Sequence, residues 1–155
     1  MAAEAGLKPE QVLELIPQQA PFRFIDELLE LDDEHAVGSY TFRADEFFYR
    51  GHFPDEPITP GVILLETMCQ TGVVALGIYL LSLELPLEQL SGYKTLFTDA
   101  TVEFSDIVKP NDRVIVRAHK EFWRRLKLRS RVELIRGDGR LVAHGTVSGI
   151  GVKRP

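Results

Sequence analysis

The sequence predicts an α+β fold in which a curved antiparallel β-sheet wraps around one long central α-helix. Residues 60–83 carry apolar side chains on nearly every face, and a helix that is apolar all round is enclosed by the rest of its protein. From residue 93 onwards, the chain changes to strand-like segments with β-branched and alternating side chains, separated by turn sequences. Antiparallel strands packed round a buried helix combine these two patterns most simply.

Composition narrows the class of protein further. The chain has 155 residues, 45% of them hydrophobic and 26% charged, so we expect residues 1–155 to form a single domain. A net charge of -5 argues against nucleic-acid binding, and the single cysteine, Cys69, excludes a disulfide framework. The N-terminus lacks the basic start and apolar run of a signal peptide, and Glu66 and Gln70 interrupt the apolar helix. We therefore expect no membrane span and a cytoplasmic location.

The first third of the chain predicts one helix and two strands. Residues 9–16 fit a short amphipathic helix that begins at Pro9 and that Pro17 ends. Residues 22–31 are ambiguous between strand and helix, and we favour a strand. Residues 35–43 are rich in aromatic and β-branched side chains, which favours a strand.

The remaining elements follow in order. The central helix is expected over residues 60–83, with Thr59 as its N-cap and Pro60 as its first residue. The turn sequences KPND and RGDG separate later strands. These strands are expected at residues 93–104, 113–122, 124–136 and 140–151.

Two potentially reactive groups lie on either side of the helix start. His52 occurs in a proline-rich loop, residues 51–60, which would hold an imidazole base at low entropic cost. Glu66 lies about two turns into the apolar helix, where burial should raise its pKa and leave a neutral acid able to donate a proton. Gln70, one turn later, could orient that acid. Each group alone also fits a purely structural role, as a packed loop histidine or a satisfied core acid.

The helix start itself is a third feature. If Thr59 caps the helix, other first-turn N–H groups remain free, and no acidic residue occupies that turn. Gly61 has no side chain to block a ligand, so these N–H groups could polarise a carbonyl with help from the helix dipole. Water or loop oxygens could equally well occupy them.

The segment GHFPDEPITPGVILLETMCQ, residues 51–70, closely resembles the active-site segment of the 3-hydroxyacyl-acyl-carrier-protein dehydratases, the FabZ-like branch of the hotdog fold. The shared pattern is a GHFP loop, a proline-glycine-valine helix start and Glu-x-Met-x-Gln. IPQQAPFRFIDELLEL and VEFSDIVKPNDRV resemble other parts of the family more faintly. Departures include Gln18-Gln19 in place of a His-Arg pair and Thr59 in place of the common Met.

The resemblance implies a single hotdog domain and a homodimer or higher homo-oligomer, in which His52 of one subunit faces Glu66 of the other. It implies reversible dehydration of a (3R)-hydroxyacyl thioester on acyl carrier protein to the trans-2-enoyl thioester, in fatty-acid or related acyl-chain biosynthesis. His52 would be the base and Glu66 the acid, and Gly61 would donate to the thioester carbonyl. Neither a metal nor an organic cofactor is implied.

Substrate binding involves further residues. Gly61, Phe53, Gln70 and Phe97 are the candidate substrate-binding residues. An apolar acyl tunnel could be lined by five side chains, although core packing explains each of them equally simply: Phe47, Phe48, Phe53, Met68 and Phe97.

An acidic carrier protein requires a basic surface. Basic residues cluster in one predicted strand, where alternation would put Arg125, Lys127, Arg129 and Arg131 on one face beside Arg124. A solvated outer sheet face is the alternative explanation. Two other functions stay open: a hotdog acyl-thioesterase, which uses its carboxylate to activate water, and a non-catalytic acyl-binding or assembly subunit.

Overall fold

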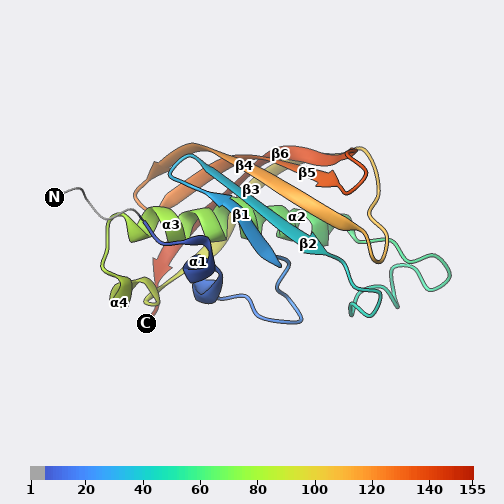
Figure 1. Ribbon diagram of the computed structural model, residues 1–155, viewed down its shortest axis with the longest axis horizontal. Helices are drawn as coiled ribbons and strands as arrows, with labels where there is room; N and C mark the ends of the chain where they lie inside the picture. Colours follow the sequence, from blue (N-terminus) through green and yellow to red (C-terminus); the bar gives the residue numbers. More distant parts are fainter. Residues whose placement is uncertain (1–5) are drawn as a thin grey trace.

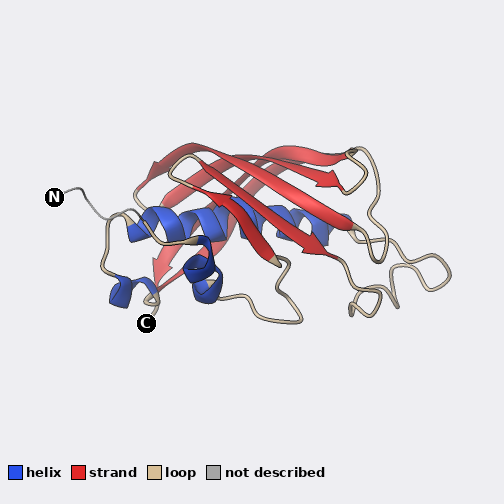
Figure 2. Cartoon of the chain, in the orientation of Figure 1, coloured by secondary structure: helices blue, strands red, loops and turns tan. Residues whose placement is uncertain are grey.

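One six-stranded sheet curves around one long helix in the computed structural model, which describes residues 6–155 (Figures 1 and 2). Residues 1–5, part of the N-terminus from which no signal peptide is expected, lie outside the described residues. The elements are α1 (Pro9–Leu15), β1 (Glu27–Leu31), β2 (His35–Thr41), α2 (Gly61–Cys69), the π-helix η1 (Gln70–Ala75), α3 (Leu76–Ser82), α4 (Leu87–Leu90), β3 (Tyr93–Phe104), β4 (Arg113–Arg124), β5 (Lys127–Arg136) and β6 (Leu141–Lys153).

All neighbouring strands pair antiparallel, in the order β1-β2-β4-β5-β6-β3. The sheet arches over the helix, which runs along its concave side (Figure 2). This arrangement confirms the predicted fold class. It also leaves β3, a strand of twelve residues, at one edge of the sheet.

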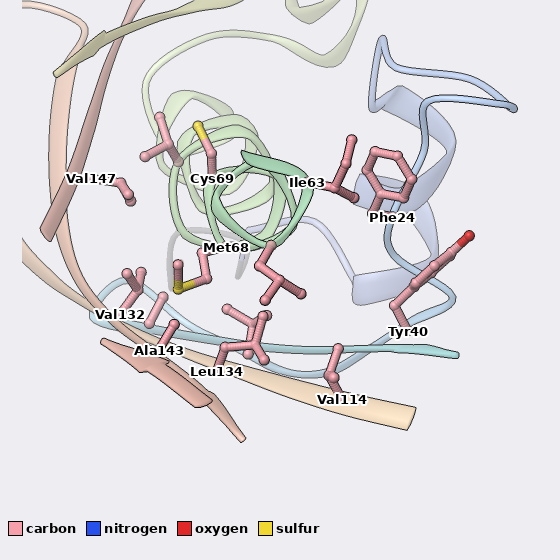
Figure 3. Packing of buried hydrophobic residues seen from close by; sticks show 14 of the residues in the cluster. Phe24, Tyr40, Ile63, Met68, Cys69, Val114, Val132, Leu134, Ala143 and Val147 are labelled. Atoms are coloured by element: carbon pink, nitrogen blue, oxygen red, sulfur yellow. The ribbon is translucent and has the colours of Figure 1, made fainter. Parts of the chain in front are cut away.

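Side-chain alternation explains how the sheet holds the helix. Val114, Val116 and Ala118 of β4 are buried against the core, while Arg117 between them points away. Figure 3 shows Met68 of α2 directed towards a floor of small and branched apolar side chains from the sheet. Met68 is fully buried in this core.

The central helix is continuous from Gly61 to Ser82 but changes its winding in the middle. In η1 the N–H of Leu76 donates to the carbonyl of Thr71, five residues earlier. The hydroxyl of Ser130 in β5 donates to the carbonyl of Gly72 at 2.6 Å and so satisfies an oxygen within the widened segment. The sequence pattern contained no sign of this π-helix.

The helix lies very close to the sheet at η1. A Cβ added at Gly72 would lie 2.8 Å from a methyl group of Val132, so any larger residue would push the helix away from β5. By length and composition the 22-residue helix could cross a membrane, but 67% of its most apolar window is buried inside the protein. Such burial is typical of a core helix.

Several predicted boundaries were wrong. Residues 22–26 are not strand, because the N–H of Phe24 donates to the side chain of Gln70 rather than to a neighbouring strand. The strand predicted from residue 124 begins at Lys127, because Arg125 and Leu126 form the preceding turn with φ angles of 52° and 64°. Arg125 therefore does not share a strand face with the lysine and arginines that follow. The short helix α4 was not predicted.

Candidate active site

His52 lies in the loop between β2 and α2, which projects beyond the N-terminal end of the central helix (Figure 1). Its Nδ1 is 2.9 Å from the backbone carbonyl oxygen of Ile58. A carbonyl oxygen can only accept, so Nδ1 carries the proton and donates it to Ile58. In the neutral ring the lone pair is therefore on Nε2, which makes Nε2 the atom available as a base.

The backbone holds this loop closed at both of its ends. The N–H of His52 donates to the carbonyl of Phe48 at 3.1 Å, and the N–H of Ile58 donates back to the carbonyl of His52 at 2.9 Å. The hydroxyl groups of Tyr49 and Thr59 share a buried hydrogen bond of 2.7 Å. Because these bonds span the loop, the imidazole is fixed before any ligand arrives.

Thr59 does not cap the helix, so the predicted N-cap is wrong. The helix begins at Gly61 with Pro60 as its N-cap residue, and among residues 6–155 no side chain supplies a capping hydrogen bond. The hydroxyl of Thr59 is hydrogen-bonded to the hydroxyl of Tyr49 instead. The backbone N–H of Thr59 donates to the carbonyl of Val108 at 2.8 Å. The sequence did not predict a role for Tyr49 in this site, and only its hydrogen bond to Thr59 in the structure shows that role.

Glu66 is partly buried on α2 and is held by Gln70, as the i+4 spacing predicted. Nε2 of Gln70 donates to Oε1 of Glu66 at 3.0 Å and to the carbonyl of Phe22 at 2.9 Å, while Oε1 of Gln70 accepts from the N–H of Phe24 at 2.7 Å. Gln70 is fully buried, and all of these partners fix the orientation of its amide.

Burial raises the pKa of Glu66, and the hydrogen bond from Gln70 lowers it by a smaller amount. A carboxyl group in this setting keeps its proton to higher pH than a solvated one, which suits a general acid. Burial also raises the pKa of the neighbouring Cys69 thiol, with the charge of Glu66 adding to the effect. Cys69 is therefore a poor nucleophile and a core residue.

The start of α2 is open on one side. Gly61 is exposed, and the side chain of Val62 is 72% exposed although it is apolar. The N–H groups of Ile63 and Leu64 donate to the carbonyl of Pro60, whereas the N–H of Gly61 has no acceptor within residues 6–155. A Cβ at Gly61 would lie 3.6 Å from the ring of Phe104, so the end of β3 borders the helix start.

The single chain does not bring all the predicted residues together. Glu66 and Gln70 are in contact, but no hydrogen bond or ion pair joins His52 to Glu66 within the described part of the chain. Phe53 stacks on the ring of His52 with centroids 4.2 Å apart and is 51% exposed. Phe97 lies apart from these groups on β3, where it is 43% exposed.

The other predicted tunnel residues differ among themselves. Met68 is fully buried in the core, and Phe48 packs against the core and an aromatic cluster, so both have structural roles in the single chain. Phe47 stays 46% exposed. Within residues 6–155, no group of three or more His, Cys, Asp or Glu side chains is placed to hold a metal ion.

The fold and this arrangement of loop, helix start and acid define a class of protein. Residues 16–148 match the FabA-like domain, and the chain therefore belongs to the FabA-like family. Two of its relatives are both named 3-hydroxyacyl-[acyl-carrier-protein] dehydratase FabZ. The chain is 37% identical over 112 residues to the protein of Clostridium botulinum (strain Eklund 17B / Type B), covering 70% of this chain and 73% of the relative. It is 36% identical over 121 residues to that of Chloroflexus aggregans, covering 77% and 78%.

Solved structures support the hotdog fold at much lower sequence identity. The dehydratase heterocomplex ApeI:P from Xenorhabdus doucetiae superimposes with a TM-score of 0.72 at 14% identity, covering 96% of this chain and 93% of that one. The thioesterase HI1161 from Haemophilus influenzae superimposes with a TM-score of 0.67 at 13% identity, covering 99% and 96%. At these identities the likeness concerns the fold and leaves the reaction open.

Proposed function

We propose that the protein is a 3-hydroxyacyl-[acyl-carrier-protein] dehydratase of fatty-acid or related acyl-chain biosynthesis. The observation that carries the proposal is the pair of prepared groups: an imidazole whose Nε2 lone pair is free and a partly buried carboxyl group with a raised pKa. The FabZ relatives have the corresponding activity in their names. A cytoplasmic location and a single domain over residues 1–155 accompany this function as predictions.

The proposed reaction removes water from a (3R)-hydroxyacyl thioester. Nε2 of His52 takes the proton from the α-carbon, and the N–H of Gly61 donates to the thioester carbonyl oxygen and stabilises the charge that develops there. Glu66 gives its proton to the β-hydroxyl group, which leaves as water, because hydroxide itself is a poor leaving group. A proton then passes from the imidazolium to the carboxylate and restores both groups.

We infer that the site is completed across a homodimer. Within the described residues β3 is an edge strand with an unpaired backbone side, and it carries the exposed apolar residues Leu96, Phe97 and Phe104. The ring of Phe104 borders the start of α2, where Val62 is exposed. A long apolar edge strand is a pairing surface, and two copies of β3 can pair antiparallel about a two-fold axis. Such a dimer would cover Val62 and would bring His52 of one subunit towards Glu66 of the other.

The acyl carrier protein is the proposed carrier of the substrate, and the basic surface expected for it is smaller than the sequence indicated. Lys127 and Arg129 both face Asp99 of β3, at 3.4 Å and 3.8 Å, which offsets part of their charge. Arg125 belongs to the turn before the strand. Carrier docking through β5 would therefore depend mainly on Arg131, which stays exposed.

Two assays test the reaction. Purified protein is mixed with a 3-hydroxyacyl thioester, and the conjugated enoyl product is followed by ultraviolet absorbance while free thiol is measured in parallel. Enoyl formation without thiol release supports the dehydratase. Release of free thiol would indicate a thioesterase. If neither the enoyl product nor free thiol appears, the protein would be an acyl-binding subunit.

A mixing experiment tests whether the site is shared between subunits. His52→Ala and Glu66→Gln are each expected to be inactive and folded. If the site combines His52 of one subunit with Glu66 of the other, unfolding and refolding them together produces hybrid dimers that contain one intact site. Statistical mixing should restore about a quarter of the wild-type rate, because half of the dimers are hybrids and each has one working site of two. A mixture that stays inactive would place both groups in the same chain.

A further inference from the structure

A second cluster of titratable groups lies far from the candidate active site, on the convex face of the sheet. Residues that alternate with the core-facing positions point outwards here, and they line a surface groove of about 430 Å³. His35 of β2 and His119 of β4 are directly paired across the two strands, and Asp32 precedes them in the β1–β2 turn. β4 is separated from the edge strand β3 by two strands, and β2 by three.

The two imidazoles face each other through ring nitrogens. Nε2 of His35 and Nδ1 of His119 share a hydrogen bond of 3.0 Å, which a bound ion would have to replace. Nδ1 of His35 is 3.3 Å from Oδ1 of Asp32, and that oxygen also accepts from the N–H groups of Glu34 and His35 at 2.7 Å each. Asp32 is thus anchored by the backbone, and its carboxylate beside Nδ1 of His35 favours the tautomer with the proton on Nδ1 and the lone pair on Nε2.

This is the arrangement that a metal-binding histidine needs. A carboxylate behind one ring nitrogen fixes the tautomer and raises the basicity of the other nitrogen. We propose that His35 Nε2 and His119 Nδ1 chelate one divalent transition-metal ion, with Asp32 orienting His35 from behind. When the ion binds, His119 takes the tautomer with its proton on Nε2, and water completes the coordination within the groove.

The spacing of the two nitrogens is compatible with a square-planar or octahedral ion. Two nitrogens 3.0 Å apart that each lie about 2.05 Å from one ion subtend an angle of about 94° at that ion. This angle matches neighbouring positions of a square-planar or octahedral ion, whereas tetrahedral zinc would need the nitrogens about 3.3 Å apart. Imidazole ligands in tetragonal geometry favour Cu²⁺ and Ni²⁺.

The charge around the groove is compatible with a cation. Three carboxylates and two guanidinium groups line it, so the groove is slightly negative before the histidines are counted: Glu30, Asp32, Glu133, Arg117 and Arg131. At its margin, Lys120 and Glu34 form an ion pair of 3.3 Å and offset each other.

Isothermal titration of the full-length, tag-free protein with Ni²⁺ tests the site without reference to enzymatic activity. We expect one Ni²⁺ per chain, bound more tightly than Zn²⁺. His35→Gln and His119→Gln should each weaken binding at least about tenfold, and Asp32→Asn about tenfold, as outer-shell partners of metal ligands do. The paramagnetic resonance spectrum of bound Cu²⁺ should show hyperfine splitting from two nitrogens, reduced to one in either histidine variant.

His144→Gln is the matched control. His144 is an exposed strand histidine that also faces a carboxylate, Glu103, at 3.5 Å, but it has no second imidazole beside it. This variant should bind Ni²⁺ as the wild type does. Equal losses in His144→Gln and His119→Gln, or no Ni²⁺ binding beyond that of the His35→Gln/His119→Gln double variant, would overturn the proposal. Thermal melting of each variant shows that any loss occurs in folded protein.

Discussion

Replacing Gln70 by methionine should both lower the stability of the fold and raise the pKa of Glu66. Methionine matches glutamine in length and has no branch, so it fits the buried space. It leaves the N–H of Phe24 buried without an acceptor, which costs about 1–3 kcal/mol. Loss of the hydrogen bonds to Phe22 and Glu66 adds about 1 kcal/mol more, because both partners can reach some water.

The expected loss is therefore about 2–4 kcal/mol in the free energy of unfolding. For a chain of 155 residues this corresponds to a fall in Tm of roughly 5–15 °C. Calorimetry or circular dichroism at fixed protein concentration measures it. Glu66→Gln is the control, because its amide oxygen can still accept from Gln70 and the bonds to residues 22–24 remain.

The same variant has a kinetic signature. The hydrogen bond from Gln70 lowers the pKa of Glu66, so its removal raises that pKa further. A general acid must be protonated, so the rate falls as pH rises through its pKa, and this limb should move to higher pH in Gln70→Met. A Tm within 1 °C of wild type would refute the assigned role of Gln70 in tying residues 22–24 to the helix. An unmoved limb would refute its contact with the catalytic acid.

Three further predictions concern stability, reactivity and assembly. Burial raises the pKa of Glu66 in the folded state, so ionising Glu66 destabilises the wild-type fold. This destabilisation is absent below the ordinary pKa of 4.5 and grows as pH rises through the folded-state pKa. The Tm of Glu66→Gln relative to wild type should therefore increase with pH, and a constant difference from pH 4 to 8 would contradict this. Cys69 should react with a thiol reagent only after unfolding, as it is 4% exposed and its thiol pKa is raised, and fast labelling of native protein would exclude this packing. Phe104→Glu should shift the protein from dimer to monomer in analytical ultracentrifugation and lower activity with it, whereas Phe122→Glu, on β4, should not.

Much of the fold could be predicted from local pattern. The strand at residues 93–104 agrees with β3 at both ends, because it lies between a helix terminator and a turn. The strand predicted at residues 22–31 was too long by five residues, because Phe24 is anchored by Gln70, 46 positions away. Contacts at such separation leave no periodic signal in the sequence.

The candidate site likewise combines features that local sequence pattern predicts with features that depend on contacts between distant residues. Glu66 and Gln70 are one helical turn apart, so their contact follows from helix geometry alone. Thr59 looked like an N-cap because its residue type and position suit one, but a competing hydroxyl, that of Tyr49, occupies it. The tautomer of His52 depends on the carbonyl of Ile58, and any residue type at position 58 would offer the same carbonyl.

The π-helix in the middle of the central helix determines how α2 is rotated about the helix axis relative to α3. α2 presents Glu66 and α3 packs in the region of α1, and each α-helical residue turns its successor by about 100°. The wider turn fits one extra residue into nearly the same rotation, so winding the same six residues of η1 as ordinary α-helix would rotate the acid-bearing half by about that angle relative to α3. The π winding between Gln70 and Leu76 therefore sets the direction in which the acid points relative to α3.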